Sequence, residues 1–275
     1  MEENKNSGQD LLMDLLPQVS SQLRGSLGNI HGALNHLLPP EKLEGDFSAQ
    51  QHTAILWQSY YRVLRVVNNL SAAPLLMEDA PFEKENTELV GWLDDLCRQA
   101  QPLSELKHIT LTFHTDLSVH VTAIHRGYLE RLVWNLLSNA LKFTEEGGSI
   151  RVELACCDRQ ISLKVTDTGC GISPQLMETV FDRYRHTERM DPLPHGLGLG
   201  LPLCRCIAQR HGGRLLLQSE EGRGTMVMVS LPDTRQHSDV VRDVPFQYAG
   251  GFQPVLMELS DALPFRAYLP QHLDD

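Results

Sequence analysis

The feature that most constrains the fold is the alternation of two hydrophobic periods between residues 88 and 232. Helical spacing of apolar residues predicts helices over 89–103, 128–143 and 199–211. Alternation of apolar and polar residues predicts strands over 109–113, 150–154, 161–165 and 225–231. The pair Asp158-Arg159 predicts a hairpin between two of these strands. Segregated helices and largely antiparallel strands favour an α+β fold, built as a two-layer α/β sandwich.

Two amphipathic helices are predicted ahead of this region, within residues 11–80. The apolar stripe of the first consists of Leu12, Leu16, Val19, Leu23, Leu27, Ile30, Leu34 and Leu37. Pro39-Pro40 ends this helix, and Asp46 or Ser48 is placed to cap the second. The stripe of the second consists of Ile55, Leu56, Val63, Val66, Val67 and Leu70. Because single-striped helices make a poor core alone, we expect a homodimer in which two hairpins form a four-helix bundle.

The composition of the chain limits which partners it can bind and where in the cell it is expected. The chain has 275 residues, and its 24 basic and 35 acidic side chains give a net charge of -11. Such a charge argues against nonspecific binding of nucleic acid, which depends on lysine and arginine. No apolar run approaches the roughly 20 residues of a membrane helix, and residues 1–10 are polar. We therefore expect a flexible N-terminus over 1–10, a cytoplasmic location and no direct insertion into a membrane.

A polar face follows the helix predicted at 128–143. Asn135, Asn139 and Lys142 are four and three residues apart, which places them on one side of that helix. A carboxamide oxygen can ligate a hard cation, and an ammonium group can pair with phosphate. The pattern predicts a site for a phosphate chain and Mg²⁺, and the same spacing also fits a solvated polar face.

Two glycine-rich segments accompany this face. Asp167 ends a predicted strand and is followed by Gly169 and Gly171, which allow tight turning and close approach of the backbone. A carboxylate in this position can accept a hydrogen bond from an exocyclic amine such as that of adenine. A second segment opens the helix at 199–211 with Gly196, Gly198 and Gly200. Backbone N–H groups at such a helix start favour phosphate.

Taken in this order and spacing, the three segments resemble the N, G1 and G2 boxes of one ATP-binding domain. That domain is shared by sensor histidine kinases and the gyrase, heat-shock chaperone and MutL ATPases. The segment 180–184 is similar to the kinase F box, and 221–225 is similar to the closing glycine turn. The resemblance covers residues 86–232 and implies the Bergerat fold. Residues 233–275 show no clear period and are interpreted as a C-terminal tail.

The resemblance implies a role for each matching residue. Asn139 would ligate Mg²⁺, while Asn135 and Lys142 would contact the phosphates of ATP. Asp167 would bind the adenine amine, in surroundings shaped by Gly169, Gly171 and, from the closing turn, Thr225. Gly196, Gly198 and Gly200 would cradle the phosphates. The segment 182–195 would be a mobile lid, whose candidates for stabilising the transferred phosphoryl group are Arg183, Arg185 and Arg189.

One position separates the branches of this superfamily. Members that hydrolyse ATP carry a glutamate four residues before the Mg²⁺-binding asparagine, where it activates water. Asn135 occupies that position here. Because a carboxamide is no base at neutral pH, the pattern indicates the kinase branch and implies the activity of an ATP-dependent protein-histidine kinase.

The phosphoacceptor site departs from the family pattern. Histidine kinases typically read Ser-His-Glu-Leu-Arg-Thr-Pro-Leu where residues 20–27 read Ser-Ser-Gln-Leu-Arg-Gly-Ser-Leu. Ser21 therefore stands at the acceptor histidine, and Gln22 replaces its acidic neighbour. A serine hydroxyl needs a base that glutamine cannot supply. His31 lies about 15 Å further along the helix axis, so we expect it and His36 to be surface residues rather than acceptors.

Three functions remain open on these residues. The first is a two-component sensor histidine kinase that transfers the γ-phosphoryl group of ATP in signal transduction. The second is a degenerate kinase that binds ATP, dimerises and regulates a response regulator or a partner kinase. The third is a serine protein kinase of the same superfamily. In each case the expected cofactors are ATP and Mg²⁺.

Overall fold

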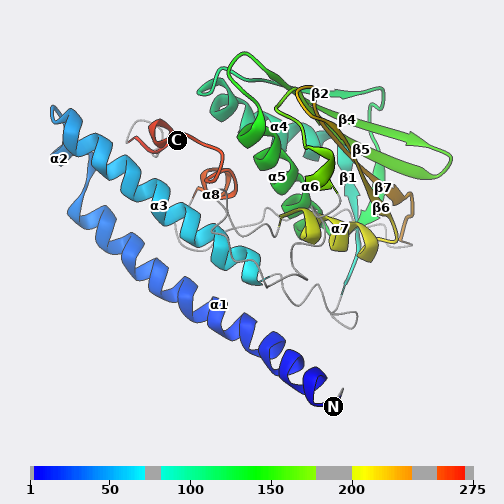
Figure 1. Ribbon diagram of the computed structural model, residues 1–275, viewed down its shortest axis with the longest axis horizontal. Coiled ribbons are helices and arrows are strands. Elements are labelled where there is room, and N and C mark those ends of the chain that lie inside the picture. The colour runs from blue at the N-terminus through cyan, green and yellow to red at the C-terminus, as the bar shows by residue number, and fades with distance from the viewer. Residues whose placement is uncertain (1–2, 72–81, 178–199, 237–252, 270–275) are drawn as a thin grey trace. The chain divides into compact units, whose positions relative to one another are not determined.

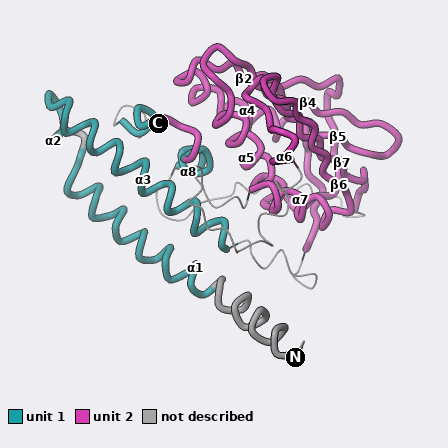
Figure 2. Tube along the Cα trace, in the orientation of Figure 1, with its two compact units in different colours: residues 1–80, 248–260, 265–275 teal, residues 81–247, 261–264 magenta. Residues whose placement is uncertain are grey.

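The computed structural model describes residues 3–71, 82–177, 200–236 and 253–269, with side chains from residue 18 onward (Figure 1). The chain divides into two compact units, coloured separately in Figure 2. The first comprises residues 1–80, 248–260 and 265–275, and the second comprises 81–247 and 261–264. Of the helices described, none is both long and apolar enough to cross a membrane.

The second unit is built on a five-stranded sheet in the order β2-β4-β5-β7-β6. These strands are β2 (Thr110–Thr115), β4 (Ser149–Cys157), β5 (Gln160–Asp167), β6 (Arg214–Glu220) and β7 (Gly224–Pro232). The β2–β4 pair is parallel, and the other neighbours are antiparallel. Asp158 and Arg159 adopt positive φ angles of 51° and 60°, as a two-residue hairpin turn requires. The hairpin predicted from this pair is confirmed.

Helices cover one face of this sheet, as Figure 1 shows. They are α4 (Leu89–Glu105), α5 (Arg126–Phe143) and α7 (Gly200–Arg210), with a short α6 (Pro174–Met177) after β5. Ile150 and Val152, at alternate positions of β4, are fully buried. The residues that alternate with them are polar and include Glu153, whose carboxylate pairs with Lys164 at 2.7 Å. One apolar face and one polar face confirm the two-layer α/β sandwich.

A small second sheet pairs β1 (Glu85–Glu88) with β3 (Val121–Ile124) in antiparallel register. The chain that leaves β7 continues along this sheet. The carbonyl oxygen of Thr234 accepts a hydrogen bond from the N–H of Ala123 at 2.7 Å, and the N–H of Thr234 donates to Oγ1 of Thr122 at 3.2 Å. Two residues later, Gln236 and Asn86 exchange hydrogen bonds. Residues 233–236 therefore belong to the second unit rather than to a separate tail.

The first unit contains a helical hairpin of α1 (Glu3–Leu37) and α3 (Phe47–Ser71), with a short α2 (Pro40–Leu43) between them. α1 begins at Glu3, inside the segment expected to be flexible, and ends before Pro39. Oδ1 of Asp46 accepts a hydrogen bond from the N–H of Ala49 at 2.9 Å, so Asp46 rather than Ser48 caps α3. Leu27 of α1 and Trp57 of α3 are among the buried side chains of this unit.

The C-terminal residues pack against α3, which the lack of a hydrophobic period did not predict. They form α8 (Pro254–Glu258) and the 3₁₀ helix η2 (Phe265–Tyr268). Tyr268 is fully buried, its ring centroid lies 5.5 Å from that of Tyr61, and its hydroxyl donates to the carbonyl of Leu256 at 2.9 Å. The hydroxyl of Tyr61 in turn accepts a hydrogen bond from the N–H of Gln253 at 3.4 Å. α3 thus buries a second face against the end of its own chain.

Candidate functional site

α5 presents the polar face that its sequence predicts. Its other sides are embedded, because Leu132, Val133, Leu136, Leu137 and Leu141 are each at most 2% exposed. Asn135 is buried as well, at 1%, whereas Asn139 and Lys142 are half-buried. Nζ of Lys142 lies 5.5 Å from the centroid of the Phe143 ring. The face therefore has a buried carboxamide at one end and a solvent-accessible carboxamide and ammonium group toward the C-terminus of the helix.

The first residue of α7 lies against this face. A β carbon placed on Gly200 would stand 3.4 Å from Oδ1 of Asn135 and 3.9 Å from Nδ2 of Asn139. The start of an 11-residue helix, where the first N–H groups have no partner within the helix, thus lies beside the two carboxamides. Such N–H groups attract anions, so this arrangement suits a phosphate chain between α5 and α7.

Asp167 lies at the end of β5 and is held by the backbone on two sides. Its Oδ1 accepts hydrogen bonds from the N–H of Gly169 at 2.9 Å and from the N–H of Thr225 at 3.2 Å. Burial raises the pKa of the Asp167 carboxyl, and the two N–H donors oppose that shift. Oδ2 makes no hydrogen bond with the described residues. The carboxylate is therefore fixed in orientation and keeps one oxygen available for a further donor.

The loop after Asp167 packs against the end of α5. The N–H of Cys170 donates to the carbonyl of Phe143 at 3.1 Å. A β carbon on Gly169 would approach the same carbonyl oxygen to 2.4 Å, so only glycine fits there. Gly171 has a positive φ of 68°, and a β carbon on it would lie 2.1 Å from the carbonyl oxygen of Glu220. These contacts hold the loop after Asp167 at the C-terminal end of α5.

Ser219 supports this loop and was missed by the sequence analysis. Its Oγ accepts a hydrogen bond from the N–H of Ile172 and lies 2.9 Å from Oγ1 of Thr225. A single serine within a strand carries no sequence signal of such a role. Thr225, predicted as a binding residue, contributes a backbone N–H that positions Asp167.

Several predicted site residues lie outside the described part of the chain. They are the F-box segment 180–184, the lid residues 182–195 with Arg183, Arg185 and Arg189, and the glycines Gly196 and Gly198. Their proposed roles stay predictions.

The predicted phosphoacceptor position, Ser21, is exposed on α1, and so is Gln22. His36 is exposed as expected, whereas His31 is only partly exposed. The His31 ring is half-buried, with its centroid 5.2 Å from that of Trp57 and 5.9 Å from that of Tyr60. Burial lowers the pKa of His31. His31 is less exposed than expected because the second helix supplies aromatic rings on the face that it shares with α1.

Comparison with known proteins agrees with this geometry. Residues 125–235 match the family described as histidine kinase-, DNA gyrase B-, and HSP90-like ATPase. The matched segment starts at the N-cap of α5 and ends just after β7, so it contains Asn135, Asn139, Lys142, Asp167 and Gly200. Residues 125–235 thus form a histidine kinase-type ATPase domain.

Over more of its length, the chain is similar to sensor histidine kinases. It is 28% identical over 240 residues to histidine kinase P4 of Formosa agariphila, a match covering 84% of this chain and 17% of that protein. It is 27% identical over 234 residues to the sensor protein SrrB of Staphylococcus aureus, covering 83% of this chain and 39% of SrrB. The chain therefore spans well under half the length of these two relatives.

Two solved structures share the fold. Full-length ShkA in complex with AMPPNP superposes with a TM-score of 0.64 at 21% identity, covering 82% of this chain and 47% of ShkA. The histidine kinase ThkA in complex with the response regulator TrrA gives a TM-score of 0.54 at 17% identity, covering 85% of this chain and 66% of that one.

Proposed function

We propose that the chain binds ATP and Mg²⁺ between α5, the end of β5 and the start of α7, as a dimeric protein of the sensor histidine kinase class. The observation that carries this proposal is the convergence of three distant segments. Gly200 lies against Asn135 and Asn139, and the loop after Asp167 is hydrogen-bonded to the last turn of α5. These segments contribute a helix start, two carboxamides and an oriented carboxylate.

Each group has a distinct task in nucleotide binding. Oδ2 of Asp167 is the acceptor for the adenine amine, which gives selectivity for ATP over nucleotides that lack that donor. Asn139 is accessible and can turn its carboxamide oxygen toward a hard cation, so it would hold Mg²⁺. Mg²⁺, when bound, would neutralise part of the phosphate charge. Lys142 would contribute a further positive charge from the same helix face.

Exposed apolar side chains on the hairpin support the dimer. On α1, Val19, Leu23 and Ile30 are 44%, 41% and 48% exposed. On α3, Ile55 and Val63 are 43% and 51% exposed. Their spacings of four, seven and eight residues form a stripe along each helix, typical of a helical bundle seam. A second copy of the hairpin would cover both stripes and complete a four-helix bundle.

The sensor histidine kinase class suggests both the chemistry and the partners of the chain. Asn135 stands where ATP-hydrolysing members carry a glutamate base, so the bound nucleotide would be a phosphoryl donor rather than a substrate for hydrolysis. The complex of ThkA with TrrA supports a response regulator as the partner, and a second kinase is the other candidate. ATP as the donor makes the cytoplasm the compartment for this reaction.

A second candidate function, that of an ATP-binding regulator, is favoured by Ser21. The exposed serine at the acceptor position has only glutamine beside it, so its hydroxyl lacks a neighbouring base. His31, the alternative nucleophile, is packed among aromatic rings. Both observations indicate that the chain phosphorylates itself slowly if at all.

Incubation with γ-labelled ATP and Mg²⁺ separates these functions. We expect nucleotide to bind and the chain itself to acquire no acid-labile label. Acid-labile label would indicate a phosphohistidine and active autophosphorylation, and acid-stable label would indicate a phosphoserine and the serine-kinase function. Absence of nucleotide binding would contradict the proposal itself.

A further inference from the structure

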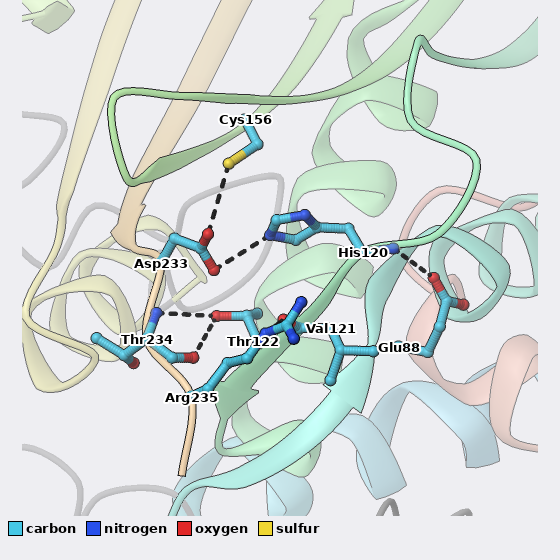
Figure 3. Close-up of polar contacts among 8 residues, drawn as sticks. All are labelled: Glu88, His120, Val121, Thr122, Cys156, Asp233, Thr234 and Arg235. Atoms are coloured by element: carbon cyan, nitrogen blue, oxygen red, sulfur yellow. Dashed lines mark hydrogen bonds and ion pairs between the residues drawn. The ribbon is translucent and has the colours of Figure 1, made fainter. Parts of the chain in front are cut away.

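Three side chains with metal-ligating atoms meet at one end of the second unit, outside the nucleotide site. His120 immediately precedes β3, Cys156 is the penultimate residue of β4, and Asp233 directly follows β7. Figure 3 shows the three side chains directed toward one another. They come from sequence positions far apart, so the fold rather than local structure brings them together.

The ligand atoms of these three side chains lie at separations close to those found around a single metal ion. Nε2 of His120 lies 3.1 Å from Oδ1 of Asp233, and Sγ of Cys156 lies 3.7 Å from Oδ2 of Asp233. The three ligand atoms all lie within 4.8 Å of one another. Ligands at about 2.0–2.3 Å around a tetrahedral Zn²⁺ stand about 3.3–3.8 Å apart. Small rotations of the side chains would therefore place all three on one ion.

The backbone beneath this cluster is fixed by hydrogen bonds. The N–H of His120 donates to Oε1 of Glu88 at 3.1 Å, and the N–H of Asp233 donates to the carbonyl of Arg159 at 2.9 Å. Next to Asp233, Thr234 is hydrogen-bonded on both sides to β3 (Figure 3). Two of the three ligands thus stand on anchored backbone, which lowers the entropic cost of gathering them around an ion.

The three side chains are largely buried, but each keeps some exposure to solvent. The side chains of His120 and Asp233 are 13% and 24% exposed, and Cys156 is half-buried. Burial, reinforced by the charge of Asp233, raises the pKa of the Cys156 thiol. In the metal-free protein the proton of the Cys156 thiol forms a hydrogen bond to Oδ2 of Asp233. A bound cation would replace that proton, which would pass to solvent.

We propose that His120, Cys156 and Asp233 form a site for Zn²⁺ or a similar transition-metal ion, independent of ATP binding. An imidazole, a thiolate and a carboxylate are the ligands that Zn²⁺ takes, and a thiolate is unsuited to Mg²⁺. Three protein ligands leave the fourth position to water. The ion would join the start of β3 to the ends of β4 and β7, and it would hold residues 233–236 against β3.

The test uses the full chain freed of metal by a chelator and then titrated with Co²⁺, which replaces Zn²⁺ and is visible by absorption. A thiolate-to-cobalt charge-transfer band should grow to saturation at one ion per chain and disappear when Zn²⁺ is added. Mg²⁺ should not displace the Co²⁺. Cys156→Ser should abolish the band, and His120→Gln or Asp233→Asn should weaken Co²⁺ binding at least about tenfold.

Cys157→Ser is the matched control, because Cys157 is the adjacent residue of β4, is exposed, and points to the opposite face of the sheet. This variant should retain the band. No band in the unmodified chain, or a band that survives Cys156→Ser, would overturn the proposal.

A second measurement needs no variant and so does not depend on folding of a mutant. Zn²⁺ should slow alkylation of Cys156 at least about tenfold, followed by mass spectrometry, because a coordinated thiolate is shielded. The alkylation rate of Cys157 should stay unchanged. Equal protection of both cysteines, or of neither, would contradict a site at Cys156.

Discussion

His125 and His211 are joined by a hydrogen bond from the backbone N–H of His125 to Nε2 of His211, at 3.0 Å. Nδ1 of His211 lies 2.8 Å from the carbonyl oxygen of Ile207, so it carries the proton and the imidazole is neutral. His125 caps α5, and His211 follows the last residue of α7. The bond therefore couples the two helices that hold Asn139 and Gly200.

This bond predicts a loss of stability in acid. Burial lowers the pKa of His211 to about 4, below its ordinary value of 6.5. The pKa of His211 is lower in the folded chain than in the unfolded chain. The contribution of neutral His211 to the free energy of unfolding is therefore complete above pH 6.5 and is lost as the pH falls toward 4. Urea unfolding should show a decrease of about 3 kcal/mol in the free energy of unfolding between pH 7.5 and pH 4 from this residue.

His211→Gln should flatten that pH dependence, whereas His114→Gln, at an exposed position of β2, should leave it unchanged. The same pH slope in the unmodified chain and in His211→Gln would rule out His211 as its source.

A second prediction concerns the close approach at Gly171. Gly171→Ala should reduce the free energy of unfolding by about 3 kcal/mol, because the new methyl group meets the carbonyl of Glu220 and the backbone has positive φ. Gly222→Ala is the matched control, since Gly222 has a similar φ of 80° but no atom within 4 Å of its β carbon position. It should lose only about 1 kcal/mol. Equal losses, measured by denaturant titration, would mean that the contact with Glu220 is unimportant.

The parts of this architecture that depend on local sequence could be predicted. The hairpin at Asp158-Arg159 and the polar face of α5 arise from residues adjacent or one helical turn apart, so the sequence pattern contains them. Contacts between residues that are distant in the sequence could not be predicted, because they depend on the topology of the fold. The meeting of His120, Cys156 and Asp233 requires knowing that β3, the end of β4 and the exit of β7 lie together.

In the helical hairpin, too, some features could be predicted from local sequence and others could not. The stripe with Ile55 and Val63 is visible in the sequence. The structure leaves Ile55, Leu56, Val63 and Val66 exposed, whereas Val67 of the same stripe is buried. The second apolar face of α3 contains Trp57, Tyr60 and Tyr61, which are three and four residues apart and therefore lie on one side of the helix. It was not predicted because the stripe drawn from the sequence contained aliphatic residues alone. Its partner segment ends the chain, where short apolar clusters have no period.

The exposed stripe predicts how the dimer can be broken. Ile30→Glu and Val63→Glu place a charge where a second hairpin would pack, and each should weaken dimerisation at least about tenfold. Asn29→Glu is the control, because Asn29 is exposed on α1 beside the stripe rather than within it. Sedimentation velocity at several concentrations measures the change. A chain that stays equally dimeric in all three variants would have its interface elsewhere.

Restoring the acceptor should restore autophosphorylation. Loss of a positioned base typically lowers a rate by about 10²–10⁴-fold, which is the deficit expected at Ser21 with Gln22. The double variant Ser21→His with Gln22→Glu should acquire acid-labile label from γ-labelled ATP.

Asn29→His, which places an imidazole elsewhere on the exposed surface of α1, should not acquire this label. Failure of the double variant while ATP still binds would show that these two positions are not the only deficit. Strong acid-labile labelling of the unmodified chain would refute the prediction.

Calorimetry of ATP and Mg²⁺ binding to the Asp167→Asn variant tests the nucleotide site most directly. The new carboxamide can keep the hydrogen bonds from Gly169 and Thr225 through its oxygen, and it then presents an N–H group where Oδ2 would accept the adenine amine. Because hydrogen bonds to charged groups contribute about 1.5–3 kcal/mol, the dissociation constant should rise at least about tenfold. Glu153→Gln, on the polar face of the sheet, should bind as the unmodified chain does. An unchanged affinity in Asp167→Asn would contradict the assignment of this carboxylate to the adenine of ATP.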